Sequence, residues 1–525
     1  MCRRPYRGRA GPGPAGGIQV EEIPCDPVPN AYGFSIPMIS PSPRVSTARI
    51  LGYALGEGAT SITINGISNF AMLYYTQVLG LGAVAAGIAL SISLIVDAVI
   101  DPVMGHVTDN TRTRYGARLP YILWGGIGLA VTFFLVWLLP GWTHSPTALF
   151  VCVLGTNLAV RFAMTVFGIP YNALGFEICP GYEDRSRLQG IRMAFNQAVN
   201  LLFGALAWSM FFRDKTGPDG SRIDGTTVAG NYMNMGIVLS VFALILILLC
   251  VAATRFSAKD NRGAHLEGNT IGAFWKDLSG ILCDRVAWYV FGFFAIAQFA
   301  MLLVSQIQMF TYVFFMKLPA DAKTMVHGGG MVAFAIGALL QASLTQRMDK
   351  KTTGYIGMLA SIVGGLALFV MFMGGLLKPE SSLALGSVAI PIGFVAFALG
   401  QALWWGGCGI LTPLAMSMVA DLSEINFLKT GVLKDGSYGA FFTFILKACM
   451  SAGLLVTGWV VDWAGIISGA ATQTPAAAFN IAVMTFLSGP ALVVVSFVIL
   501  RKYPVDRFYL KNLEQSLSLS RPEAH

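Results

Sequence analysis

The chain has 525 residues, of which 55% are hydrophobic and only 12% are charged. Soluble globular proteins carry roughly twice that charged fraction, so the composition excludes an ordinary soluble domain. The formal net charge is +8, but the basic residues lie mainly between long apolar stretches, which argues against a nucleic-acid-binding surface.

Apolar runs long enough to cross a membrane recur along the whole chain. A bilayer core of about 30 Å requires roughly 20 apolar residues in a helix. We therefore predict an all-α polytopic membrane protein with twelve transmembrane helices, near residues 51–79, 83–107, 119–139, 147–176, 188–212, 231–254, 286–315, 327–346, 354–376, 387–418, 437–463 and 477–500.

The basic residues predict the orientation. With twelve spans both termini share one side, and 26 of the 35 Lys and Arg residues fall on that side, whereas 6 fall on the other. Segments rich in Lys and Arg stay in the cytoplasm. We expect both termini to be cytoplasmic, in a plasma (inner) membrane.

The longest expected cytoplasmic loop separates two sets of six spans. Basic turns, DNTRTRYG after the second span and QRMDKKTTG after the eighth, recur at matching places in the two sets. The expected order is a disordered cytoplasmic tail, a six-helix bundle, a central cytoplasmic loop, a second six-helix bundle and a cytoplasmic tail, at residues 1–45, 46–254, 255–285, 286–500 and 501–525.

Six ionisable residues interrupt the expected spans. A charge at the bilayer centre costs at least about 2.5–3.5 kcal/mol, so such residues usually face a polar cavity and have a function there. They are three acids and three bases: Glu57, Asp97, Asp101, Arg161, Arg192 and Lys447.

Asp97 and Asp101 are four residues apart and lie on one helical face. Two adjacent carboxylates in a site of low polarity need a metal cation, a shared proton or a basic side chain such as Lys447 to neutralise them. The alternative is a permanent ion network that only fixes helix packing.

A second stripe of polar positions occupies the fourth span. Arg161, Thr165, Gly168 and Asn172 recur at helical spacing. A guanidinium beside a hydroxyl and an amide suits a carboxylate or phosphate ligand. The alternative is that Arg161 forms an internal salt bridge, either to Glu57 or to the aspartate pair.

Motifs for catalysis are absent from the sequence. The five histidines are scattered, the eight cysteines form no CxxC pair, and no GxxxxGK[ST] loop occurs. We expect no enzyme activity, no bound cofactor and no use of ATP.

Four segments carry a resemblance to a known family. They are DAVIDPVMGHVTDNTRTRYGARLPYIL, YYTQVLGL, FGIPYNALGFEI with DRSRLQGIR, and ADLSEINFLKTGVLKDGSYGAFFTFILK. From about residue 50 to 500 the chain resembles the glycoside–pentoside–hexuronide cation symporters, the melibiose-carrier branch of the major facilitator superfamily. The resemblance implies the major facilitator fold and alternating access, with sugar moved together with Na+, Li+ or H+.

The resemblance also implies residue roles. It places Asp97, Asp101, Thr165 and Lys447 in the cation-coupling site, and Arg192 near the sugar. It implies a cytoplasmic gate made of Arg112, Arg114, Arg118, Asp421, Glu424 and Lys434.

Departures from the melibiose carriers suggest altered specificity and coupling. Their span-one and span-four sugar-binding aspartates are Ser61 and Gly168 here, and a supporting tryptophan is Asn172. An asparagine before the second aspartate is Ile100, and a glycine is replaced by Arg161. We therefore expect an acidic ligand such as a hexuronide, and proton coupling or uniport with weak or absent Na+ dependence. We also count Glu57 among the expected substrate-binding residues.

The leading hypothesis is a monomeric secondary transporter for a sugar, glycoside or hexuronide, with membrane lipids and no nucleic acid as partners. A sister hypothesis is symport of a lysophospholipid or another amphiphile. A hypothesis of another class is a membrane sensor or scaffold that does not transport.

Overall fold

The computed structural model describes residues 45–111, 113–139, 145–179, 182–216, 220, 222–255, 284–385, 388–430, 435–470, 472–505 and 509. Almost all of the expected N-terminal tail and central loop, and most of the expected C-terminal tail, lie outside the described residues.

The first bundle contains six long helical segments. In chain order its elements are α1 (Thr47–Leu73) with the π-helical η1 (Tyr74–Val78), α2 (Ala83–Asn110), α3 (Leu119–Trp137), α4 (Pro146–Ile178), α5 (Tyr182–Val199) with η2 (Asn200–Ala205) and α6 (Leu206–Phe211), and α7 (Ala229–Thr254). A short antiparallel hairpin of β1 (Lys215–Thr216) and β2 (Arg222–Ile223), followed by η3 (Gly225–Thr227), joins α6 to α7.

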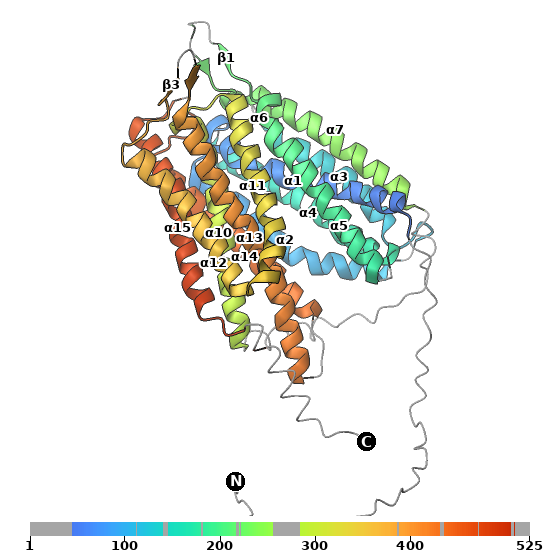
Figure 1. Cartoon of the computed structure of the whole chain (residues 1–525). Coiled ribbons are helices and arrows are strands. Elements are labelled where there is room, and N and C mark those ends of the chain that lie inside the picture. The colour runs from blue at the N-terminus through green and yellow to red at the C-terminus, as the bar shows by residue number, and fades with distance from the viewer. Residues whose placement is uncertain are drawn as a thin grey trace, which may run out of the picture. The chain divides into compact units, whose positions relative to one another are not determined.

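The second bundle repeats this plan. It consists of α10 (Arg285–Phe310) with η4 (Thr311–Phe315), α11 (Ala320–Arg347), α12 (Lys350–Leu368) with η5 (Phe369–Met373), α13 (Ile392–Thr430), α14 (Asp435–Trp463) and α15 (Pro475–Arg501). A hairpin of β3 (Leu383–Leu385) and β4 (Val388–Ile390) precedes α13, and both hairpins lie at one end of the helices (Figure 1). We call this the hairpin end.

Twelve long helical segments therefore confirm the expected fold class. Ten helices in the described part are long and apolar enough to span a membrane, and α1 and α5 are not among them. Both carry polar side chains on the faces that they bury: α1 contains Glu57 and Asn65, and α5 contains Arg192. The expected tenth span is displaced, because its first residues form β4 while α13 continues to Thr430.

The first helices of the two bundles end in the same way. A π-helical turn closes each one, and a backbone hydrogen bond follows from Leu81 to Tyr75 and from Leu318 to Tyr312. Each of these two hydrogen-bonded turns contains one residue in the left-handed region, Gly80 with φ of 71° and Lys317 with φ of 48°. This shared geometry supports the internal repeat that the basic turns indicate.

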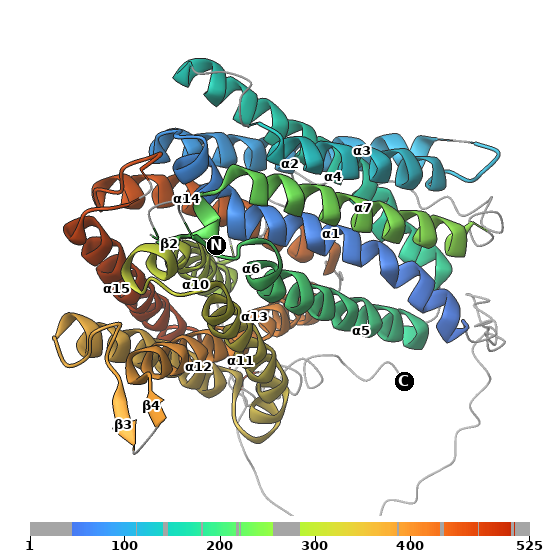
Figure 2. The ribbon, with the colours of Figure 1, turned by 90° about the horizontal axis from the view of Figure 1, so that it is seen from above.

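The two bundles meet most closely along α2 and α14. Seen from above, α14 of the second bundle lies beside α2 of the first (Figure 2). The other helices of the second bundle lie further from α3 than α14 does. A side chain at Gly87 would come within 2.8 Å of the Leu454 carbonyl oxygen, and one at Gly458 within 2.6 Å of the Ala83 carbonyl oxygen. Close backbone approach through glycine is typical of membrane helix pairs.

The hairpin end is closed by contacts between the bundles. Lys323 Nζ on α11 lies 2.5 Å from Asp224 Oδ2, and the Lys323 side chain is completely buried. Arg222 donates to the carbonyl oxygens of Lys317 and Leu318 at 2.9 and 2.8 Å. These contacts hold α11 and the segment before it against the first bundle.

Gly87→Ala is expected to destabilise the protein by about 1–3 kcal/mol, because the added methyl group forces two backbones apart. Thermal unfolding of the purified protein measures this effect. Gly155→Ala is the matched control in α4, since no atom lies within 4 Å of its added methyl group. Equal unfolding temperatures for the two variants would contradict the close backbone contact between α2 and α14, which we call the α2–α14 seam.

Candidate functional site

The two predicted aspartates share one hydroxyl donor. Thr165 Oγ1 on α4 lies 2.8 Å from Asp97 Oδ1 and 2.9 Å from Asp101 Oδ1. One hydroxyl carries a single hydrogen, so it donates to one carboxylate at a time. Asp97 is 6% exposed. The one-turn spacing in α2 therefore brings both carboxylates to the same point on α4.

A lysine from the other bundle completes this cluster. Lys447 Nζ on α14 lies 2.8 Å from Asp97 Oδ2 and also contacts Asp101 Oδ2. Lys447 thus contacts one oxygen of each carboxylate, and the other two oxygens share the single Thr165 hydroxyl. Of the partners that the sequence leaves open for the aspartates, Lys447 contacts both carboxylates, and these ion pairs cross between the bundles.

Arg161 lies one turn before Thr165 on α4 and is only partly buried. It interacts electrostatically with Asp97 and Asp101, yet the described part of the chain offers it no salt bridge and no hydrogen bond. Further along the same stripe, Gly168 has open space within 4 Å of the position of a side chain. The internal salt bridge considered for Arg161 is therefore not formed among these residues.

Glu57 and Arg192 form a second cluster, inside the first bundle. The Arg192 Nη2 atom lies 2.6 Å from Glu57 Oε2, and its Nε atom lies 3.0 Å from the same oxygen. Arg192 Nη2 also donates to Asn172 Oδ1 at 2.7 Å. Asn196 Nδ2 donates to Glu57 Oε1 at 3.2 Å. These charges neutralise each other within one bundle.

Two tyrosines support this second cluster. The rings of Tyr53 on α1 and Tyr171 on α4 stack with centroids 4.4 Å apart, and each hydroxyl donates to the other residue's carbonyl oxygen. The guanidinium of Arg192 lies over both rings. An arginine on an aromatic face gains cation–π attraction. Sequence reasoning missed this pair because nothing marks the two tyrosines as neighbours.

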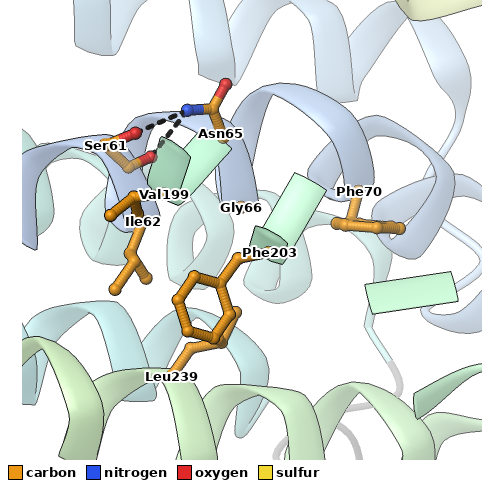
Figure 3. A pocket seen from close by; sticks show the side chains of 8 residues that line it. All are labelled: Ser61, Ile62, Asn65, Gly66, Phe70, Val199, Phe203 and Leu239. Carbon is orange, nitrogen blue, oxygen red and sulfur yellow. Dashed lines mark hydrogen bonds between the residues drawn. The ribbon is translucent and has the colours of Figure 1, made fainter. Parts of the chain in front are cut away.

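Ser61 lies one turn after Glu57 on α1 and is buried. Its Oγ atom donates to the Asn196 carbonyl oxygen and accepts from Asn65 Nδ2. Beside it, α1, the end of α5, η2 and α7 enclose a small pocket that is apolar apart from Ser61 and Asn65, with the side chains of Phe203 and Leu239 facing Ile62 (Figure 3). The pocket offers few polar atoms, so it is a poor site for a sugar.

The expected gate residues do not form one cluster. Arg112 and Lys434 lie outside the described residues. Arg114 stacks over the adjacent Tyr115 ring, and Glu424 is exposed. The two remaining residues form salt bridges within their own bundles, Arg118 to Glu177 at 2.9 Å and Asp421 to Lys350 at 2.6 Å.

The site contains no candidate for a resident metal centre. The described residues include no group of three or more His, Cys, Asp or Glu side chains that could hold a metal ion.

This geometry agrees with comparisons to known proteins. Residues 52–507 match the model of a family described as MFS/sugar transport protein. The chain belongs to this family. It is therefore a multi-pass transporter of the major facilitator superfamily and not an enzyme, which confirms the resemblance that the sequence motifs carry.

Relatives of this MFS/sugar transport protein carry several names. It is 25% identical over 468 residues to the glucuronide carrier protein homolog of Escherichia coli, covering 88% of this chain and 93% of the relative. It is 24% identical to the isoprimeverose transporter of Lactiplantibacillus pentosus, covering 88% and 90%. It is 23% identical to the sodium-dependent lysophosphatidylcholine symporter 1 of Xenopus tropicalis, covering 91% of each.

Solved structures share its fold. A bacterial homolog of the human lysosomal transporter Spinster, in an inward-facing and unoccupied conformation, superposes with a TM-score of 0.61 at 13% identity, covering 87% of this chain and 98% of that one. A mutant of the nucleoside transporter NupG superposes with a TM-score of 0.60 at 15% identity, covering 87% and 99%.

Lys447→Met is expected to lower the stability of the transporter by about 3 kcal/mol, because two carboxylates lose their ammonium partner. Adding Asp101→Asn should restore part of this loss, since one negative charge disappears. Thermal unfolding measures both effects, and Lys502→Met, at an exposed position after α15, is the control. If the double variant is no more stable than Lys447→Met, the pairing with Asp101 contributes nothing.

Proposed function

We propose that this protein is a secondary active transporter that moves a hexuronide or a related glycoside by alternating access, together with a cation, and that H+ is favoured over Na+. The observation that carries the proposal is Arg161. It is a partly buried cation near the aspartate cluster, and among the described residues it forms no salt bridge or hydrogen bond with a carboxylate. A carboxylate of the substrate supplies that partner in a geometry that guanidinium groups favour.

The charges of the site support coupling. Asp97 and Asp101 contribute two negative charges, and Lys447 and Arg161 contribute two positive charges. An anionic substrate therefore adds an unbalanced charge in a region of low polarity, where such a charge is costly. One cation that binds with the substrate offsets it, so binding of the two is favoured together.

We favour H+ over Na+ because the carboxylate oxygens of the aspartate pair already have contacts with other side chains. Every carboxylate oxygen of Asp97 and Asp101 already contacts Thr165 or Lys447. A metal ion needs several oxygen ligands, so it has to displace the ammonium group of Lys447. A proton needs only one carboxylate oxygen, and it weakens the attraction for Lys447 by removing a charge.

Contacts at the hairpin end support alternating access. They close one end of the molecule, and the Lys447 ion pairs lie further along the α2–α14 seam. Protonation that releases Lys447 loosens this second contact between the bundles. Following the distribution of basic residues, we place both termini in the cytoplasm of a plasma membrane and the hairpin end outside, and we take the transporter to be a monomer.

Lysophospholipid symport is the second candidate. The relatives from Xenopus tropicalis and Danio rerio carry that name, and both are called sodium-dependent. A zwitterionic lipid headgroup also contains an anionic phosphate that Arg161 is suited to bind.

Uptake by proteoliposomes distinguishes these candidates. We expect accumulation of a methyl glucuronide when an inward H+ gradient is imposed, with no requirement for Na+ at constant pH and ionic strength. Strict dependence on Na+ would overturn the choice of H+. Uptake of lysophosphatidylcholine without uptake of any glycoside would favour the second candidate, and a lack of all uptake would favour a sensor or scaffold.

Arg161→Gln is expected to raise the KM for a glucuronide by roughly tenfold to a hundredfold, because a charge-assisted contact worth about 1.5–3 kcal/mol is lost. Uptake of neutral isoprimeverose by the same variant is the internal control and should change little. If both substrates are affected equally, Arg161 has a structural role and does not select for acidic ligands.

A further inference from the structure

Besides Trp404 Nε1 on α13, two buried side-chain nitrogen atoms in the second bundle have no hydrogen-bond partner among the described residues. They are Nε2 of Gln308 on α10 and Nε2 of His327 on α11. Gln308 is completely buried and His327 is 7% exposed. An unpaired buried polar group costs about 1–3 kcal/mol, so each such atom in a native protein calls for an explanation. Hydrogen bonds to a bound ligand are an explanation that accounts for both nitrogen atoms.

Gln308 bonds to Trp405 on α13, and the α11 face that carries His327 also reaches this ring, through Gly330. The indole Nε1 of Trp405 donates to Gln308 Oε1 at 3.2 Å. Gly330 follows His327 by three residues on α11, and a side chain at Gly330 would come within 2.9 Å of Trp405 Cδ1. Three helices of the second bundle thus converge on this ring, which is only partly buried.

This part of α11 faces the first bundle. Lys323 pairs with Asp224, and Thr324 Oγ1 accepts a hydrogen bond from the Ser209 backbone nitrogen at 3.1 Å. His327 lies one turn further along the same helix, so it projects from the side of α11 that meets the other bundle. Alternating access places a substrate between the two bundles.

The three side chains suit an uncharged sugar ring. The Gln308 amide donates hydrogen bonds, and a neutral His327 ring donates or accepts according to its tautomer. Trp405 offers an aromatic face, which packs well against apolar C–H groups. No charged group belongs to this set, whereas the aspartate cluster and Arg161 provide the charged part of the site in the first bundle.

We propose that Gln308, His327 and Trp405 form a neutral subsite of the second bundle that binds the hydroxyl groups of the substrate's sugar ring. This inference rests on the proposed transport of glycosides or hexuronides. It assigns the sugar ring to the second bundle and the carboxylate to Arg161, so that one substrate bridges both bundles.

His327→Leu provides the main test. With a leucine no nitrogen remains to bind sugar, and the described residues show no hydrogen bond of Nε2 that the substitution would break. In proteoliposomes, the KM for isoprimeverose and for a methyl glucuronide should rise about tenfold while the maximal rate changes little. Without sugar, the unfolding temperature should stay the same or rise, because an unpaired polar group has been replaced by an apolar one.

Trp405→Phe extends the test, with Trp404→Phe as its matched control. Trp404 is the preceding residue on α13, but its ring packs against Gly489 of its own bundle. We expect Trp405→Phe to raise the KM for both sugars and Trp404→Phe to leave it unchanged. His327→Gln, which restores an amide donor, should give a KM between the wild type and His327→Leu, and it replaces the leucine variant if that variant does not fold.

The results of these uptake experiments distinguish a failure of the proposed subsite from a failure of the proposed glycoside transport. If the wild type transports a glycoside or glucuronide but the His327 and Trp405 variants keep its KM, the subsite is overturned and the proposed function stands. If the wild type neither binds nor transports any glycoside or glucuronide, both proposals fail.

Discussion

Hydrocarbon cannot solvate an ion, and this constraint determines how the helices of the transporter are connected. Most charges that the described helices carry into the membrane are paired, Asp97 and Asp101 with Lys447 and Glu57 with Arg192, and Asp224 pairs with Lys323 at the hairpin end. Each pair joins elements that are distant in the sequence. The electrostatic requirement of single residues therefore becomes a set of fixed contacts between helices.

These pairs differ in which parts they join. Glu57 and Arg192 belong to one bundle, where the stacked tyrosines Tyr53 and Tyr171 hold the arginine in place. This network keeps its geometry when the bundles move as rigid bodies. The pairs formed by Lys447 and Lys323 join the two bundles, so they are the ones that such a movement has to break and remake.

Much of this arrangement can be predicted from the sequence. Long apolar runs define the helices, because a bilayer allows few alternatives to a helix. The i, i+4 spacing of Asp97 and Asp101 predicts a shared face, and their repulsion requires a counter-charge. Lys447 is the base that the sequence offers, and the structure brings it to both carboxylates. Other parts depend on helix rotation and packing, which the sequence does not specify. The choice of Arg192 as the partner of Glu57 follows from how α1 and α5 face each other. The hairpins were missed because apolar residues such as those of β4 resemble the start of the next helix.

The glycine contact between α2 and α14 has a mechanical consequence. Gly87 and Gly458 let the two backbones approach closely, so the contact resists compression. The contact is suited to be the pivot about which α2 and α14 tilt relative to each other. With a rise of 1.5 Å per residue, Asp97 lies about 15 Å from Gly87 along the axis of α2, and Asn110 lies about 35 Å from it. A tilt that displaces the aspartates slightly is therefore amplified roughly twofold at the far end of α2.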